Sequence, residues 1–187
     1  LSTTLGSVSG EVRLGDGHAV RRAAVFLEGQ GNPAGQGRER PILALRSAHT
    51  RLELLLATPG QSLQIVNDDL MVHSVFSVSP SKPLSSGAMA PGESRVVQLD
   101  RPGIIELFCS LHDAMEAVVV VAPSGLSALT SRSGSYTLTG VPAGRYRAVA
   151  YAPEVGQVSL PLEVRGGERT TLHFQVVPPS QPTVIPQ

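Results

Sequence analysis

The stretch Ile104–Val121, IIELFCSLHDAMEAVVVV, predicts two buried strands joined by a short loop. The apolar run at each end is short and bounded by turn or loop residues, as is typical of strands in the core of a β-sandwich. Between the two runs, Cys109, His112 and Met115 follow a Cys-x-x-His-x-x-Met spacing. A tight loop that a sheet holds at both ends can turn three such side chains toward one point. This stretch therefore predicts both a β architecture and a candidate site.

Similar short apolar runs continue along the chain on both sides of this stretch, bounded by Pro, Gly, Asn or Asp. They fall near residues 8–12, 23–27, 42–45, 52–56, 63–66, 96–99, 136–138, 145–151, 158–164 and 171–177. With 19 Gly and 15 Pro in 187 residues, the chain has the turn content expected of many short strands. We predict an all-β fold, although periodicity alone leaves a short helix at 51–56 as an alternative.

Composition and charge exclude several classes of protein. Lys and Arg number 15, and Asp and Glu also number 15, so the basic face of a nucleic-acid-binding protein is not expected. No apolar run approaches the roughly 18 residues of a transmembrane segment. The single cysteine, Cys109, excludes an intramolecular disulfide. The chain opens on Leu1 without a charged and apolar leader, so we expect a processed protein of the periplasm, cell envelope or extracellular space.

The ligand types at the candidate site favour copper. Soft sulfur combined with imidazole suits copper, and two His and one Cys with a weak axial Met form the sites of electron-transfer copper proteins. The loop lacks one histidine, and His73, 36 residues before Cys109, is placed to supply it. It follows the turn residues 67–69, where one strand leaves a turn, and a neighbouring strand can bring it against the Cys109 loop.

Other polar residues have simpler interpretations. His18, in a Gly-rich turn, and His173, in a late strand, are predicted to be structural or exposed. His49 precedes an apolar run and is a minor alternative to these interpretations, as a histidine that approaches the candidate copper site. Asp68 and Asp69 are predicted to be solvated, because two adjacent acids beside a turn are usually hydrated and no catalytic partner is evident.

From Leu52 to Val121 the sequence resembles the cupredoxins, and more closely the bacterial cupredoxin-containing proteins labelled methylamine utilisation proteins. The matching motifs are Thr58-Pro59-Gly60, Ile65-Val66-Asn67-Asp68-Asp69, His73-Ser74-Val75, Ala90-Pro91-Gly92-Glu93, Pro102-Gly103 and the Cys109–Met115 loop, whose spacing is similar to that of amicyanin. The resemblance implies a two-sheet Greek-key sandwich that holds one type 1 copper. In it, His73, Cys109 and His112 would be equatorial ligands and Met115 the axial ligand.

The same resemblance implies supporting roles beside the copper. The backbone amide of Ser74 would donate to the Cys109 sulfur or lie close to it, and Asn67 would brace the two ligand loops. Asp113 occupies a position that is often proline in small blue copper proteins. It would place a carboxylate near the edge through which electrons leave.

A second resemblance covers the two ends of the chain. Gly10-Glu11-Val12 with Ala23–Leu27, and residues 133–146, are similar to the opening and middle of a carboxypeptidase regulatory-like, transthyretin-type β-sandwich. Because the cupredoxin-like block separates these pieces, we expect one sandwich to be inserted into, or joined to, the other. The predicted boundaries are 6–32 and 123–177 for the split sandwich, 33–40 for a linker, 41–122 for the cupredoxin domain and 178–187 for a Pro-rich tail.

These features predict a one-electron carrier rather than an enzyme, with copper as its cofactor. Its expected partner is a redox protein such as a cytochrome or a periplasmic oxidoreductase. Loops that ring the metal should form an apolar docking patch of Leu70, Met71, Met89, Ala90, Pro91, Leu111 and Ala114. One alternative is a copper carrier or chaperone, which an exposed site would favour. Another is a structural adhesion module whose copper site is vestigial.

Overall fold

The computed structural model describes residues 4–29, 39–46, 53–153 and 155–177, and its regular elements are sixteen β-strands. The all-β prediction is confirmed. The described residues contain no helix that is long and apolar enough to cross a membrane. The helix alternative is wrong for residues 53–56, which belong to β4 (Glu53–Ala57) and pair in parallel with β10 (Glu116–Val121).

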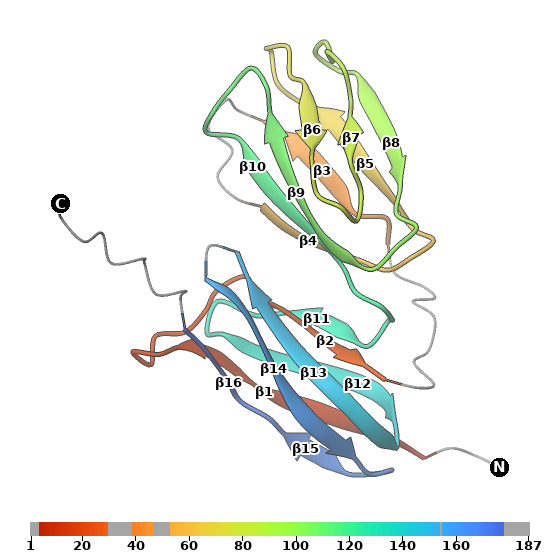
Figure 1. Ribbon diagram of the computed structural model, residues 1–187, viewed down its shortest axis with the longest axis vertical. Helices are drawn as coiled ribbons and strands as arrows, with labels where there is room; N and C mark the ends of the chain where they lie inside the picture. The colour runs from red at the N-terminus through yellow and green to blue at the C-terminus, as the bar shows by residue number, and fades with distance from the viewer. Residues whose placement is uncertain (1–3, 30–38, 47–52, 154, 178–187) are drawn as a thin grey trace, which may run out of the picture.

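The strands form two lobes, which Figure 1 shows one above the other. The central lobe takes strands from the middle of the chain, in sheets of order β4-β10-β9-β6-β7 and β3-β5-β8. Besides β4 and β10, its strands are β3 (Ile42–Leu45), β5 (Ser62–Asn67), β6 (Val75–Ser77), β7 (Leu84–Ser85), β8 (Ser94–Gln98) and β9 (Gly103–Cys109). Alternate residues of each strand, such as Leu63 and Ile65 of β5, point into one core between the two sheets.

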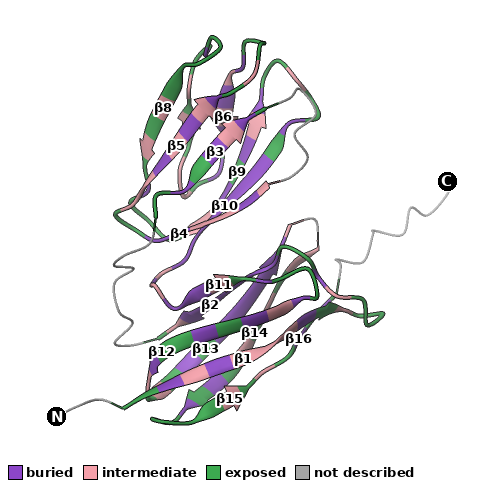
Figure 2. Cartoon of the chain, turned by 180° about the vertical axis from the view of Figure 1, so that it is seen from behind, coloured by how far each residue is buried: buried purple, intermediate pink, exposed green. Residues whose placement is uncertain are grey.

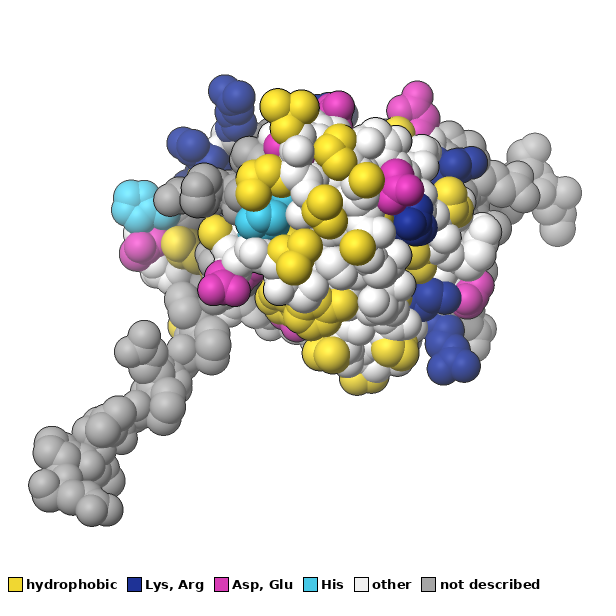
Figure 3. Space-filling model, turned by 90° about the horizontal axis from the view of Figure 1, so that it is seen from above, with side chains coloured by type: hydrophobic (Ala, Val, Ile, Leu, Met, Phe, Trp, Pro, Cys, Tyr) yellow, Lys and Arg dark blue, Asp and Glu magenta, His cyan; other side chains and the backbone are white. Residues whose placement is uncertain are grey.

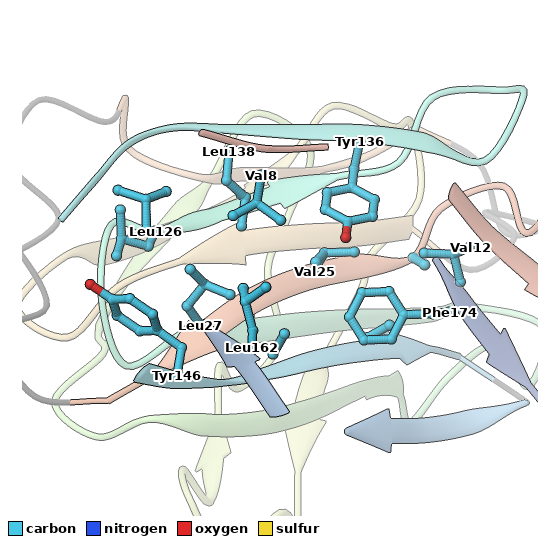
Figure 4. Close-up of a cluster of buried hydrophobic side chains, with 14 of the residues drawn as sticks. Val8, Val12, Val25, Leu27, Leu126, Tyr136, Leu138, Tyr146, Leu162 and Phe174 are labelled. Carbon is cyan, nitrogen blue, oxygen red and sulfur yellow. The ribbon is translucent and has the colours of Figure 1, made fainter. Parts of the chain in front are cut away.

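The flanking lobe takes strands from both ends of the chain, in sheets of order β12-β1-β15 and β11-β2-β13-β14, with β16 also pairing with β1. Its strands are β1 (Leu5–Leu14), β2 (Ala24–Glu28), β11 (Ser127–Leu129), β12 (Ser135–Pro142), β13 (Gly144–Ala152), β14 (Gly156–Val164), β15 (Arg169–Thr171) and β16 (Phe174–Val176). Figure 4 shows its core, to which Val8, Leu27 and Phe174 contribute from three strands. A Cβ at Gly10 would lie 1.7 Å from the Leu172 carbonyl oxygen, so this close approach requires glycine.

Strand pairing divides the described strands into two sets. In the described residues, β1 and β2 pair with strands of 127–176, and the strands of 42–121 pair among themselves. The boundaries given above stay a proposal. The predicted tail 178–187 lies outside the described residues, as does most of the predicted linker 33–40.

The two lobes share a third hydrophobic core where they meet. It consists of Ala24, Phe26, Leu54, Val118, Val120, Ala122, Val149 and Tyr151. Strand β10 is therefore buried on both faces, because Val118 and Val120 face this shared core while Val119 and Val121 face the core of the central lobe (Figure 2). Burial on both faces explains why the last four residues of this strand are an unbroken run of valines, where a half-exposed strand would alternate apolar and polar residues.

Phe26→Ala should lower the free energy of unfolding by about 3–5 kcal/mol, because it opens a cavity in the shared core. Since that core joins both lobes, amide protection in β9 and β10 should fall together with protection in β2. Hydrogen exchange followed by mass spectrometry measures both lobes in one experiment. The control Val96→Ala trims a side chain that is 55% exposed and should change stability by less than about 0.5 kcal/mol. Unchanged protection in β9 and β10 would contradict the stabilising role of the shared core.

Candidate metal centre

Three side chains with metal-binding atoms converge at one end of the central lobe. The Cys109 sulfur lies 3.9 Å from Nδ1 of His73 and 3.6 Å from Nδ1 of His112. The ligand atoms of the three residues all lie within 4.8 Å of one another. The two imidazole rings have centroids 4.7 Å apart and planes inclined by 53°. The fold thus brings together three of the four residues predicted as metal ligands, from segments 36 residues apart.

His73 lies just before β6 and is held there by a β-bridge to Met89. Its backbone amide donates to the Met89 carbonyl oxygen at 3.1 Å, and the Met89 amide donates back at 2.7 Å. The histidine is 0% exposed, and a buried imidazole needs a partner for each ring nitrogen. Nδ1 faces Cys109, and Nε2 lies 2.9 Å from the carboxylate of Asp69.

Asp69 determines which nitrogen of His73 carries the proton. The hydrogen bond to His73 is the main cause that lowers the pKa of Asp69, and a bond from the Leu70 amide lowers this pKa further. The ionised carboxylate accepts the hydrogen bond, so the proton of neutral His73 is on Nε2 and Nδ1 offers a lone pair toward Cys109. A carboxylate on the outer nitrogen of a histidine ligand orients the ring and increases its basicity.

The role of Asp69 is not evident from the sequence, which predicts that both acids beside the turn are solvated. That prediction suits Asp68, which is exposed and pairs with Arg46 at 3.2 Å. It is wrong for Asp69, whose side chain is 13% exposed and bonded to His73. The signal that could have found it is the turn: Asn67 Oδ1 accepts a hydrogen bond from the Asp69 amide at 3.1 Å, as turn-forming Asn residues do.

The ligand loop begins at Cys109, the last residue of β9, and is tied to the histidine segment through its backbone. The Ser110 amide donates to the Ser74 carbonyl oxygen at 2.9 Å. The loop then turns on a hydrogen bond from the Met115 amide to the His112 carbonyl oxygen at 3.2 Å. Backbone hydrogen bonds therefore shape the loop at both of its ends.

Met115 is buried in the same core as Cys109. Both residues line an apolar cavity of about 10 Å³, whose wall also includes Leu43, Leu45 and Val75. A cavity of this size holds one water molecule at most. Met115 thus lies on the interior side of the loop, next to the thiol, and its role as an axial ligand stays a prediction.

Asn67 is a fully buried amide that connects two loops beside His73. Its Nδ2 donates to the carbonyl oxygens of Met71 and Met89, each at 2.8 Å. Asn67 thus connects the loop before His73 to the loop that contains Met89. The prediction instead places it between the His73 loop and the Cys109–Met115 loop. The predicted approach of the Ser74 amide to the cysteine sulfur stays a prediction.

The exposed surface around the site is largely apolar, and Figure 3 shows hydrophobic side chains gathered around a histidine at this end of the molecule. Leu70 is 93% exposed, and Asp113 is exposed beside His112. The placement of Met89 in the docking patch is wrong, because this residue is 0% exposed and packs into the central core behind its bridge to His73. The other patch residues are exposed: Leu70, Met71, Ala90, Pro91, Leu111 and Ala114.

The remaining histidines lie elsewhere or outside the described residues. His18 is exposed in a turn of the flanking lobe. His173 is also in that lobe, where its Nδ1 accepts a hydrogen bond from the Glu11 amide at 3.2 Å. His49 falls outside the described residues.

The donor set fits copper better than a hard cation. Calcium and magnesium require several oxygen ligands, whereas this site offers one thiol and two imidazoles in the cluster and a thioether in the adjoining core. Thiolate and thioether ligands suit Cu(I), and imidazole suits copper in general. The residues present therefore fit a copper ion.

No protein-family model and no curated protein matches this sequence. Among solved structures, the chain is similar to a mutant of amicyanin in its Cu(I) form, with 16% identity over 52% of this chain and 97% of that chain and a TM-score of 0.40. It is also similar to a purple cupredoxin from Nitrosopumilus maritimus, with 22% identity over 37% of this chain and 77% of that chain and a TM-score of 0.34. At this degree of similarity, the function of the site must be inferred from the side chains of this chain itself.

Asp69→Asn should weaken copper binding by about 10–100-fold, because the outer nitrogen of His73 loses its carboxylate acceptor. Competition with a Cu(I) chelator measures the affinity. Asp68→Asn removes the same charge from the exposed neighbour and is expected to leave the affinity unchanged. Equal losses in the two variants would show that local charge, rather than the hydrogen bond to His73, controls the affinity.

Proposed function

We propose that this chain holds one type 1 copper and carries electrons one at a time in the periplasm or cell envelope. The observation that carries the proposal is the trio of His73, Cys109 and His112, whose ligand atoms lie within 4.8 Å of one another. Met115, buried in the same core as Cys109, would complete the set as the weak axial ligand. Thiolate, two imidazoles and a thioether together form the ligand set of electron-transfer copper sites.

The bound copper would supply the redox chemistry by gaining and losing one electron. The part of the protein is to keep the ligands still, since side chains locked by packing and hydrogen bonds hold a site in its working geometry. His73 is held by backbone bonds to Met89 and by its ring bond to Asp69. Cys109 is buried at the end of a strand whose neighbours are fixed in the sheet.

His112 is the proposed exit for the electron, because it is the partly exposed member of the trio while His73 and Cys109 are buried. Exposed apolar side chains such as Leu70 and Leu111 lie on the loops around it. A redox protein with a matching apolar face, such as a cytochrome or a periplasmic oxidoreductase, could approach this surface without stripping water from charged groups. Asp113 beside His112 would favour a partner with basic groups at the rim of its contact surface.

Burial of the site argues against the copper carrier that the sequence leaves as an alternative. A copper carrier needs an accessible site from which the metal is released, whereas three of the four proposed ligands are buried. We therefore propose an electron carrier rather than a copper carrier.

The copper-loaded, oxidised protein should be strongly coloured by a charge-transfer band from the Cys109 thiolate to copper. Cys109→Ser should remove this band, because an alcohol oxygen replaces the thiolate. Ser110→Ala alters the exposed neighbouring hydroxyl and should keep the band. Visible absorption spectra measure the intensity of the band, which is divided by the copper content of each sample. A colourless Cu(II) adduct of the unmodified protein would contradict the type 1 assignment.

Met115→Gln should lower the reduction potential while copper stays bound, because the axial ligand tunes the potential of such sites. Voltammetry measures the potential and the reversibility of the couple. Met89→Leu is the matched control, since it changes another buried methionine of the same core and conserves its volume. A shift of equal size in the control, or loss of copper from Met115→Gln, would show that the axial role is wrongly assigned.

Leu70→Lys should slow electron self-exchange between oxidised and reduced copies by about tenfold or more, because two lysines would face each other across the apolar contact. Line broadening in NMR spectra measures this rate. Val78→Lys adds the same charge at a side chain that is 78% exposed beyond the far end of β6 from His73, and it should leave the rate unchanged. The potential of both variants should stay constant. Equal rates of self-exchange in the two variants would rule out the apolar surface around His112 as the route of electron transfer.

A further inference from the structure

A groove of about 270 Å³ lies where the two lobes meet, on the face of β9 and β10 opposite the central core. It is lined by Glu106, Phe108, Glu116, Ala117, Val118, Tyr151 and Pro153. The first five residues belong to β9 and β10 of the central lobe. Tyr151 lies near the end of β13 in the flanking lobe, and Pro153 comes just after that strand. The groove therefore exists because the two lobes pack against each other.

Two carboxylates stand on this face, and neither has a counter-charge among the described residues. In the β9–β10 ladder, Glu116 pairs with Phe108 and Val118 pairs with Glu106. The two glutamates are thus diagonal neighbours on one face of the sheet, and such backbone positions lie about 7–8 Å apart. Both are exposed, and neither takes part in an ion pair within the described residues. No arginine or lysine lines the groove in that part of the chain.

Tyr151 brings a phenol hydroxyl to the same groove. Its side chain is 9% exposed, with the ring packed in the shared core. The hydroxyls of Tyr136 and Tyr146 each donate to a carbonyl oxygen, at 2.7 and 2.9 Å, whereas that of Tyr151 has no hydrogen-bond partner among the described residues. Burial raises the pKa of Tyr151, and the charge of Glu106 raises it further, so the phenol stays protonated. A hydroxyl that lines a groove and has no partner among the described residues is available to a ligand as donor or acceptor.

We propose that this groove binds the guanidinium group of an arginine presented by a protein partner. A guanidinium group is planar, always charged and has five N–H donors. It can therefore donate hydrogen bonds to two separate carboxylates at the same time. The Tyr151 oxygen accepts a further N–H, and its own proton can then point toward Glu106. Phe108, which is partly exposed, supplies aromatic surface on which a guanidinium stacks.

Other cations fit the groove less well. A metal ion needs ligand atoms that meet at one point, and the group of His, Cys, Asp and Glu side chains that meets this condition in the described residues is the trio at His73. A lysine ammonium is a compact point charge, whereas a guanidinium directs five N–H groups to several sides in one plane. Two acids and a tyrosine oxygen that line one groove therefore favour arginine.

An NMR titration of the metal-free full chain tests this proposal separately from the copper assignment. The probe is the peptide acetyl-Gly-Gly-Arg-Gly-Gly-amide, compared with the same peptide carrying citrulline, which has the shape of arginine without its charge. The arginine peptide should shift the amide signals around Glu106, Glu116 and Tyr151 and should bind more weakly as salt rises. Citrulline and lysine peptides should bind at least about tenfold more weakly.

Three variants locate the contact. Glu106→Gln and Glu116→Gln should each weaken binding of the arginine peptide by about tenfold. Tyr151→Phe keeps the ring in the shared core and should weaken binding by a few-fold through loss of the hydroxyl oxygen. Glu168→Gln, an exposed acid of the flanking lobe, should have no effect.

Three outcomes would overturn the proposal. The first is equal binding of the arginine and citrulline peptides. The second is a set of shifts that maps to the surface around His112 instead of the groove. The third is self-association of the chain that Glu106→Gln abolishes in sedimentation experiments, because the occupant would then be an arginine of a second copy.

Discussion

The burial of strand β10 on both faces is the constraint on which the rest of the molecule depends. Its two faces fill two different cores, one inside the central lobe and one shared with the flanking lobe. The strand starts immediately after Met115 and pairs with β9, which ends at Cys109. The position of β10 therefore sets both ends of the ligand loop. Moving the lobes apart would expose apolar surface to water, which is unfavourable, and would also remove a wall from the groove between them.

Burial and hydrogen bonding act together at the candidate metal centre. A buried histidine is costly unless both ring nitrogens have partners, and Asp69 satisfies the outer nitrogen of His73 with a carboxylate that remains ionised. The inner nitrogen is left with its lone pair directed at Cys109. Asn67 in turn holds the backbone of the histidine loop. The ligand geometry is thus built into the polypeptide, which suits a centre that must change its charge with little movement of its ligands.

The two surfaces proposed to bind partners would do so through different interactions. Around His112 the exposed side chains are mainly apolar, with Leu70 and Leu111 the most exposed of the large ones, so association there depends on removing apolar area from water and responds weakly to salt. In the groove between the lobes, Glu106 and Glu116 attract positive charge over a distance limited by ionic screening. Of these two surfaces, the flanking lobe contributes only to the groove, through Tyr151 and Pro153. Its place in the fold therefore has a consequence beyond support of the central lobe.

The sequence by itself determined the all-β fold and the candidate metal-binding loop, because turn chemistry, apolar period and the spacing from Cys109 to Met115 all act within a few residues. It also indicated that the valine run is buried, but not that a second lobe covers its outer face. Only the tertiary structure showed that Asp69, unlike the exposed Asp68, is bonded to His73. It also showed that Met89 lies in the core and not at the surface. The groove likewise joins Tyr151 to acids of another lobe. Such contacts depend on how distant segments pack, and local pattern does not encode which segment meets which.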